Sequence, residues 1–292
     1  MALKLEAQFR FYPGAHINVY RAQDGQLIET AVFSGENYHK NLVSITSQIG
    51  CPVGCSFCFL KNYKTVRNVS PAEHLEQVRL AVDGSDVSWF DPDKPLKVSL
   101  TRTGEPLLNP DTIDGVVNIA ETYSPSFQLA SIMPNTKNSQ KLLEYMMGYL
   151  HGYKESFQIN VSMHTTNERK RKKMIPYKEL MSFEEIAEFG AQWRQIVGKR
   201  KINLSFVLME DCEVNIGKLR EIFNPEHFAV RLALYLPSSE ETAETHPPSV
   251  HERTKEEARI AREFGYDCIE SVPGPVEFKW DTRPGSGLKM LR

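Results

Sequence analysis

Three cysteines lie close together near the start of this chain, and they form the segment with the clearest chemical potential. They are Cys51, Cys55 and Cys58, in the spacing C-x3-C-x2-C. Three thiolates on one short loop can hold three corners of a [4Fe–4S] cube, whereas such clusters usually take four cysteines. The spacing therefore predicts an iron–sulfur cluster whose fourth iron keeps a position open for a small molecule.

Structural zinc, a disulfide and chance are the alternatives for these three cysteines. Structural zinc requires four closed ligands, and the remaining cysteines, Cys212 and Cys268, lie far along the chain. Disulfide frameworks are typical of small secreted domains, which a chain of 292 residues is not. The cluster remains the favoured interpretation.

The composition indicates an ordinary globular protein, and the sequence also limits the cellular compartments in which we expect it. The N-terminus lacks the apolar core of a signal peptide, and no apolar run is long enough to span a bilayer. We therefore expect a cytoplasmic protein without membrane contact, in a compartment where thiols stay reduced. The formal net charge of −2 gives no global basic field of the kind many nucleic-acid binders carry.

One local basic run stands out, Arg169-Lys-Arg-Lys-Lys173. Most such runs are solvated faces of a helix or loop. The functional alternative is a contact to phosphate, because Lys and Arg clusters are its usual partners.

The elements that must position these residues alternate between strand and helix. The cysteine loop directly follows a predicted strand at Leu42–Ser47, and a helix follows from Pro71, with Ser70 as its N-cap. Further strands are predicted at Leu96–Thr101, Phe127–Met133, Phe157–Met163, Ile202–Met209 and Phe228–Leu236. Further helices are predicted at about 110–123, 138–150, 182–197, 214–223 and 250–264.

This alternation predicts an α/β fold, a partial (β/α)6 TIM-like barrel built on a parallel sheet. Residues 1–38 are expected to form a small N-terminal β extension, a hairpin or meander, and residues 39–292 the barrel core with its C-terminal segment. Chemistry in such barrels lies at the carboxyl ends of the strands, where the cysteine loop falls. The polar stretch 237–249 is expected to be a mobile loop.

Several motifs at strand ends carry a family resemblance. They are the cysteine loop with Phe57, the segment Gly104-Glu-Pro-Leu-Leu-Asn109, and Val161-Ser-Met-His164. Together they resemble the radical S-adenosylmethionine (SAM) superfamily, and within it the RlmN/Cfr family, whose members methylate a ring carbon of adenine in RNA. The resemblance runs from about Leu42 to Arg283.

The resemblance implies cofactors, partners and residue roles. SAM would chelate the open iron, and the reduced cluster would cleave it to a 5′-deoxyadenosyl radical, with a flavodoxin or ferredoxin-type reductant as electron donor. Glu105 would pair with the SAM amino group, and Gly104 would let the backbone approach the ligand. The other residues expected to contact SAM are Phe57, Ser131, Ser162 and His164.

The chain departs from the family where methyl transfer is concerned. The family uses two further cysteines, and here those positions hold Ser44 and, counting forward from Thr282, Leu291. Neither side chain replaces a thiolate nucleophile. An Asn expected to bind SAM after the sixth strand is replaced by Leu236-Pro237. Cys268 is the remaining candidate for a methyl carrier, although a buried hydrophobe in a strand is the commoner interpretation.

The favoured hypothesis is a radical SAM enzyme that abstracts hydrogen from a substrate not identified by the sequence, with a small molecule, nucleotide or RNA as candidates. The first alternative is an RlmN/Cfr-like RNA adenine methyltransferase that uses Cys268, or a shortened form of such an enzyme. The second is a non-catalytic iron–sulfur or SAM-binding sensor.

Overall fold

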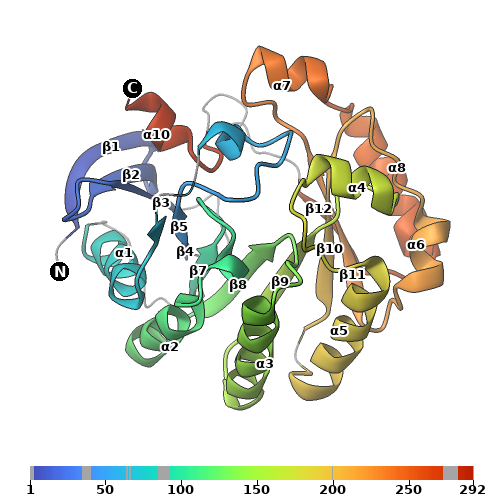
Figure 1. The fold of residues 1–292 in the computed structure, drawn as a ribbon, viewed down its shortest axis with the longest axis horizontal. Helices are drawn as coiled ribbons and strands as arrows, with labels where there is room; N and C mark the ends of the chain where they lie inside the picture. The colour runs from blue at the N-terminus through green and yellow to red at the C-terminus, as the bar shows by residue number, and fades with distance from the viewer. Residues whose placement is uncertain are drawn as a thin grey trace.

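One large sheet organises the protein in the computed structural model. The structure describes residues 3–34, 41–63, 65, 67–84, 93–198, 200–271 and 282–291. The strand order is β1-β2-β3-β4-β7-β8-β9-β10-β11-β12, so the sheet curves without closing into a complete barrel (Figure 1). The boundary expected between residues 38 and 39 lies outside the described residues.

The first three strands form an antiparallel meander that continues the barrel sheet. They are β1 (Lys4–Tyr12), β2 (Ala15–Arg21) and β3 (Leu27–Phe33), and β3 pairs antiparallel with β4 (Asn41–Ile45). The expected N-terminal β extension is confirmed as this meander. It is an extension of the sheet itself, because β3 and β4 share a hydrogen-bonded register.

In the described part of the chain, seven parallel strands follow in chain order, six as expected and one more at the far edge. Every pair from β4 to β12 along this part of the sheet is parallel. After β4 these strands are β7 (Leu96–Leu100), β8 (Ser126–Ser131), β9 (Phe157–Ser162), β10 (Ile202–Leu208), β11 (Phe228–Leu234) and β12 (Cys268–Ser271).

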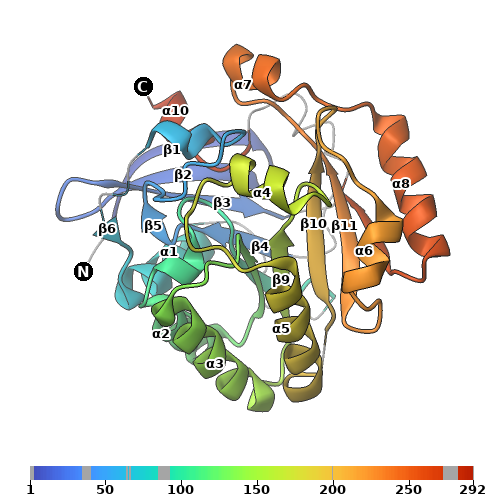
Figure 2. The ribbon, with the colours of Figure 1, turned by 45° about the vertical axis from the view of Figure 1, so that its right-hand side comes forward.

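Helices cover the outer face of these strands, and the predicted segments account for the main ones. They are α1 (Pro71–Asp83), α2 (Thr112–Tyr123), α3 (Lys137–Gly152), α5 (Phe183–Ile196), α6 (Ile216–Ile222) and α8 (His251–Glu263). Helix α1 begins at Pro71 with Ser70 as its N-cap, as predicted, and Glu73 completes a capping box with Ser70. Figure 2 shows α2, α3 and α5 along one side of the sheet and α6 and α8 beside β11.

The two faces of the parallel strands differ sharply in polarity. Alternate residues such as Val43, Leu129 and Val161 pack under the helices in the main hydrophobic core. Their neighbours along the same strands, Ser44 and Ser162 among them, face the interior. The inward-facing side of the strands thus carries polar side chains among apolar ones, and it lines a cavity in place of a second hydrophobic core.

Shorter elements surround the carboxyl ends of the strands. They are β5 (Gln48–Ile49), β6 (Arg67–Asn68), the 3-10 turns η1 (Phe59–Asn62) and η2 (Pro106–Leu108), and the helices α4 (Glu168–Met174), α7 (Glu240–Thr245) and α10 (Ser286–Met290). The polar stretch 237–249 contains α7, capped by Ser239, where the sequence predicts only a loop. No described helix is both long and apolar enough to cross a bilayer.

Candidate active site

The cysteine loop leaves β5 and turns back over the end of the sheet. Glycines at 50 and 54 take φ values of +80° and +70°, which L side chains rarely adopt. The Cys58 amide donates to the Cys55 carbonyl at 3.1 Å, and the Cys51 amide donates to the Tyr63 carbonyl at 3.0 Å. The loop is thereby folded onto itself, with all three thiols free of disulfides.

The chemistry of the three thiols fits ligands of an iron–sulfur cluster. Burial raises the pKa of Cys51 to about 12 and raises the pKa of Cys55 well above its usual range, and the neighbouring thiols add to both shifts. Backbone N–H groups aim at the sulfurs in turn: the Leu60 amide donates to Cys58 Sγ at 3.4 Å, and those of Val53 and Gly54 hold the Cys51 pKa down. Burial thus favours the neutral thiols, and a positively charged iron centre, together with these N–H groups, would stabilise the thiolates that a cluster needs.

A single metal ion does not fit the same residues. Among the described parts of the chain, no three His, Cys, Asp or Glu side chains converge as a site for one ion. In a [4Fe–4S] cluster each cysteine binds a different iron, so the cysteines need not converge on one point. The finding therefore counts against a zinc site more strongly than against a cluster.

Glu105 is buried beside this loop and anchored by three hydrogen bonds. Its Oε1 accepts from Ser131 Oγ at 2.6 Å and from the Leu107 amide at 3.1 Å, and its Oε2 accepts from the Ile132 amide at 2.9 Å. Burial raises the pKa of Glu105 to about 7, against the lowering effect of these donors and of the Arg171 guanidinium. A nearby cationic ligand would favour the charged carboxylate.

Ser131 and Gly104 therefore have structural roles that the sequence does not reveal. Ser131 bridges Glu105 and the Met133 amide, which donates to its Oγ at 2.9 Å. Gly104 has φ +94°, and a Cβ there would meet Gln48 Cβ and N at 2.6 Å. Close approach to Gln48 is enough to require glycine; contact of Gly104 or Ser131 with a ligand stays a prediction.

We expect Glu105→Gln to keep the iron content while weakening SAM binding by about 1.5–3 kcal/mol, the usual scale for a hydrogen bond to a charged group. Calorimetric titration of SAM into the reconstituted protein measures this. Glu121→Gln, on the exposed part of α2, is the matched control. Unchanged affinity in Glu105→Gln would remove this residue from the SAM site.

Phe57, Ser162 and His164 meet at the end of β9. The rings of Phe57 and His164 lie edge to face with centroids 4.6 Å apart. His164 takes a left-handed φ of 61°, and its Nδ1 accepts the Val207 amide at 3.2 Å. Burial lowers the pKa of His164 to about 3, with Arg171 and Arg231 adding to the shift. The ring is neutral near pH 7, so it suits packing and hydrogen bonding to a ligand.

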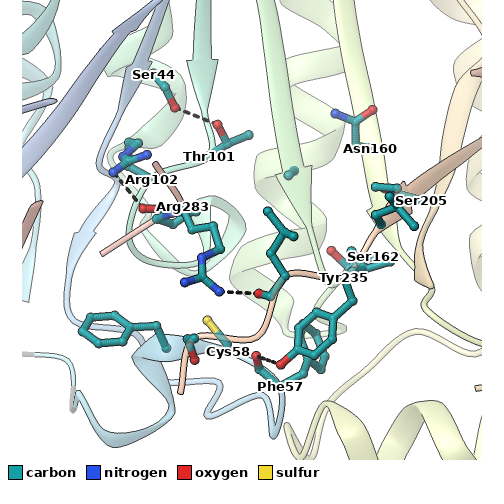
Figure 3. Close-up of a pocket in the computed structure, with 18 of the residues that line it drawn as sticks. Ser44, Phe57, Cys58, Thr101, Arg102, Asn160, Ser162, Ser205, Tyr235 and Arg283 are labelled. Atoms are coloured by element: carbon teal, nitrogen blue, oxygen red, sulfur yellow. Dashed lines mark hydrogen bonds between the residues drawn. The ribbon is translucent and has the colours of Figure 1, made fainter. Parts of the chain in front are cut away.

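An interior cavity of about 500 Å³ connects these residues to the cysteine loop (Figure 3). Cys58, Phe57, Ser162 and His164 all line it, whereas Glu105, Ser131, Cys51 and Cys55 lie outside its lining. Ser44 also lines it, with its Oγ 2.8 Å from Thr101 Oγ1. The position where the family keeps a cysteine thus faces the same interior as Cys58.

Cys268 lies on the other side of the sheet. On β12 it pairs with Val230 and packs against the main hydrophobic core, and it is not among the cavity-lining residues. Burial raises its pKa to about 11. The structure therefore gives Cys268 the surroundings of a structural thiol.

The C-terminal segment closes part of the cavity through a buried ion pair. Arg102 pairs with Glu29, and both side chains are almost fully buried. Arg102 Nη1 also donates to the Thr282 carbonyl at 2.8 Å, and Glu29 accepts the Gly285 and Gly287 amides at 2.8 and 2.6 Å. We call these contacts the Glu29–Arg102 latch.

The basic run forms helix α4, and much of its charge is already used. Arg171 is buried and donates to the backbone carbonyls of Ser162, Met181 and Ile132. Lys170 pairs with Asp211 at 3.0 Å and Lys172 with Glu168 at 2.9 Å. The predicted contact between this run and a phosphate group would therefore depend on the two remaining members, at positions 169 and 173.

A polar chain that the sequence did not indicate supports the middle of the cysteine loop. Ser56 Oγ lies 2.7 Å from His246 Nε2, and His246 Nδ1 lies 3.2 Å from Asp211 Oδ2. Phe57 packs edge-on against the same imidazole at 6.3 Å. These contacts fix the loop against the segment that follows β10, and no spacing in the sequence signals them.

Sequence comparisons relate the chain to RNA methyltransferases. It is 26% identical over 215 residues to the probable dual-specificity RNA methyltransferase RlmN of Flavobacterium psychrophilum, and 29% identical over 227 residues to RlmN 2, with the same description, of Protochlamydia amoebophila. The matches cover 73% and 75% of this chain but 59% and 60% of those relatives. No protein-family model matches the chain.

Structural comparisons show which fold the chain shares. A radical SAM methyltransferase from Sphaerobacter thermophilus aligns over 98% of this chain and 81% of its own, with a TM-score of 0.75 and 18% identity. SuiB of Streptococcus suis, solved with SAM bound, aligns over 80% of this chain and 47% of its own, with a TM-score of 0.52 and 14% identity. The chain is RlmN/Cfr-like in sequence and has the fold of radical SAM proteins.

Proposed function

We propose that this chain is a radical SAM enzyme that holds a [4Fe–4S] cluster on Cys51, Cys55 and Cys58 and abstracts hydrogen from a substrate bound in its interior cavity. When bound and reduced, the cluster supplies the electron that cleaves SAM to the 5′-deoxyadenosyl radical. The observation that carries the proposal is that Cys58 opens onto the same cavity as Ser162, His164 and Phe57. A SAM molecule at the cluster would thus have its adenosyl part enclosed by the barrel.

The residues of the chain bind, orient and shield. Glu105 offers a carboxylate for the SAM amino group, and Ser131 with the Ile132 amide holds it in place. Phe57 and His164 offer an apolar wall for the adenine, while Ser162 offers a hydroxyl for the ribose or carboxylate. The Glu29–Arg102 latch holds the C-terminal segment over the opening of the cavity and restricts the access of water. A radical intermediate requires such protection.

The described lining of the cavity holds no cysteine in the place of the family's methyl-transfer cysteines. This favours hydrogen abstraction without methyl transfer. Ser44 lines it where the family has a cysteine, and Cys268 packs on the helix-covered side. An electron donor of the flavodoxin or ferredoxin type belongs to this proposal, as does a cytoplasmic location.

An RNA adenine methyltransferase is the second candidate, because the sequence relatives carry that description. It would need a methyl carrier other than the residues at 44 and 291. The non-catalytic sensor is a weaker alternative, since the buried Glu105 network and the enclosed cavity suit catalysis.

Product analysis after anaerobic incubation with SAM and dithionite separates these functions. We expect 5′-deoxyadenosine and methionine, little S-adenosylhomocysteine, and no S-methylcysteine in tryptic peptides. The reason is that only the radical half of the family's chemistry has its residues in this chain. Cys268→Ser is the control and should give the same products.

Two outcomes would contradict the proposal. Equal amounts of S-adenosylhomocysteine and 5′-deoxyadenosine, or a methyl group on Cys268, would restore the methyltransferase. SAM binding without either product would favour the sensor.

A further inference from the structure

The charged side chains that line the interior cavity are all cationic. Among the described residues they are Arg102, Arg231 and Arg283, and no Asp or Glu joins them. Arg102 is compensated by Glu29 in the latch. Arg283 donates to the Leu236 carbonyl and belongs to the C-terminal segment. Arg231 is the one that comes from the middle of a barrel strand, on β11.

Arg231 is bonded to hydroxyls and to no carboxylate within the part of the chain that the structure describes. Its Nη1 donates to Ser205 Oγ at 3.1 Å and its Nη2 to Ser271 Oγ at 2.7 Å. Burial lowers the pKa of Arg231, and among the described residues no anion offsets this effect. A buried guanidinium without a counter-ion is costly, unless a ligand supplies the missing charge.

The hydroxyls that accept from Arg231 keep their own O–H groups as donors. Ser205 accepts from the guanidinium with its oxygen, so its own O–H is left to donate. Ser162 lies next to Ser205 in the parallel register, as Arg231 does on the other side. Arg231 and Ser205 thus lie side by side across β10 and β11, and we call this pair the Arg231 row; Ser162, which the proposed function gives to SAM, is its neighbour on β9.

We infer that the Arg231 row holds an anionic group, a phosphate or carboxylate, of a small-molecule substrate that shares the cavity with SAM. The inference rests on the proposed function for the choice of substrate over SAM. The carboxylate of SAM is its only anionic group, and in the proposed function SAM chelates the open cluster iron, so an anion at Arg231 would come from a second ligand. Planar guanidinium groups suit both oxyanions because they bind them through two parallel hydrogen bonds.

A small molecule is favoured over RNA by the position of the row and by the surrounding charges. The row lies on inward-facing strand positions, under a cavity mouth that the C-terminal segment partly covers. On α4, Lys170, Arg171 and Lys172 are engaged within the protein. A long phosphate backbone would therefore find few uncompensated cations on the described part of that surface.

Equilibrium dialysis of two probes, labelled inorganic phosphate and labelled acetate, tests the inference on the reconstituted full chain, with and without saturating SAM. We expect at least one probe to bind, and Arg231→Gln to weaken it about tenfold or more, as for a lost hydrogen bond to a charged group. Arg231→Lys should retain part of the binding. Arg262→Gln, an exposed arginine on α8, is the matched control and should change nothing.

The probes distinguish the sources of the anion, and each other result overturns the inference. Preference for phosphate assigns a phosphorylated substrate, and preference for acetate a carboxylic acid. Equal binding of the better probe by wild type and Arg231→Gln, in proteins of equal iron content and melting temperature, would overturn it. So would an Arg231-dependent loss of SAM affinity of the same size, or uptake of a short RNA with neither probe bound.

Failure of the proposed function gives a separate pattern. The dialysis needs no SAM cleavage, and its SAM-free arm needs no SAM binding. Arg231-dependent anion binding in a protein that never yields 5′-deoxyadenosine would leave the anion site standing and refute the radical chemistry alone.

Discussion

Cys55→Ala is expected to abolish the brown iron–sulfur chromophore and SAM cleavage together. Cys55 is the central member of a loop in which the thiols already influence each other's pKa. Removal of one leaves two protein ligands for a cube that has no fourth cysteine within the loop, and two thiolates do not hold it stably. Iron and sulfide content, the visible spectrum and 5′-deoxyadenosine yield are the measurements.

A cysteine outside the loop provides the control. Cys268→Ala removes a half-buried thiol from β12 and should keep full iron content and activity. Full iron content in Cys55→Ala would show that the cluster is held elsewhere or that the site binds something else. Cys51→Ala and Cys58→Ala should repeat the Cys55 result, because each supplies one iron ligand.

Glu29→Ala is expected to lower the free energy of unfolding by about 3–5 kcal/mol, the usual cost of removing one partner from a buried ion pair. Glu29 is fully buried and Arg102 nearly so, so the substitution leaves a buried guanidinium without a counter-ion. It also leaves the amides of Gly285 and Gly287 without their acceptor. Urea denaturation measures the loss.

Limited proteolysis reports on the latch more directly than overall stability does. In Glu29→Ala we expect cleavage within 282–291 under conditions that leave the wild-type segment intact. Glu6→Ala breaks the exposed pair with Arg21 and should leave both the unfolding midpoint and the cleavage pattern unchanged. A Glu29→Ala protein as stable and as resistant as wild type would mean that the latch contributes little.

Local patterns were enough to predict most of the fold and to single out several residues that prove to line one cavity. The N-cap at Ser70, the individual strand and helix segments and the cysteine spacing each depend on a few neighbouring residues, so they can be identified in one sequence. Cys58, Phe57, Ser162 and His164 indeed share a cavity. The basic run at 169–173 was harder, because charge alone does not show that Arg171 turns inward.

Contacts between distant residues could not be predicted in this way. Glu29 and Arg102 are 73 positions apart, and Ser56 and His246 are 190 apart. Neither pair belongs to a sequence motif. Each pair forms only because the curvature of the sheet places distant segments of the chain next to each other. The polar residues of the cavity wall could not be predicted for a related reason. The sequence shows that Arg231 interrupts an apolar strand, but only the curvature of the sheet shows which side of the strand it faces.

The latch also has a consequence for the order of assembly. The Gly285 amide reaches Glu29 across 256 positions, a long loop to close and therefore a late contact in folding. During synthesis every strand from β1 to β12 leaves the ribosome before residues 282–291 do. We therefore expect the barrel strands to pair before residues 282–291 close over the cysteine loop, and iron and sulfide to enter most readily in that interval.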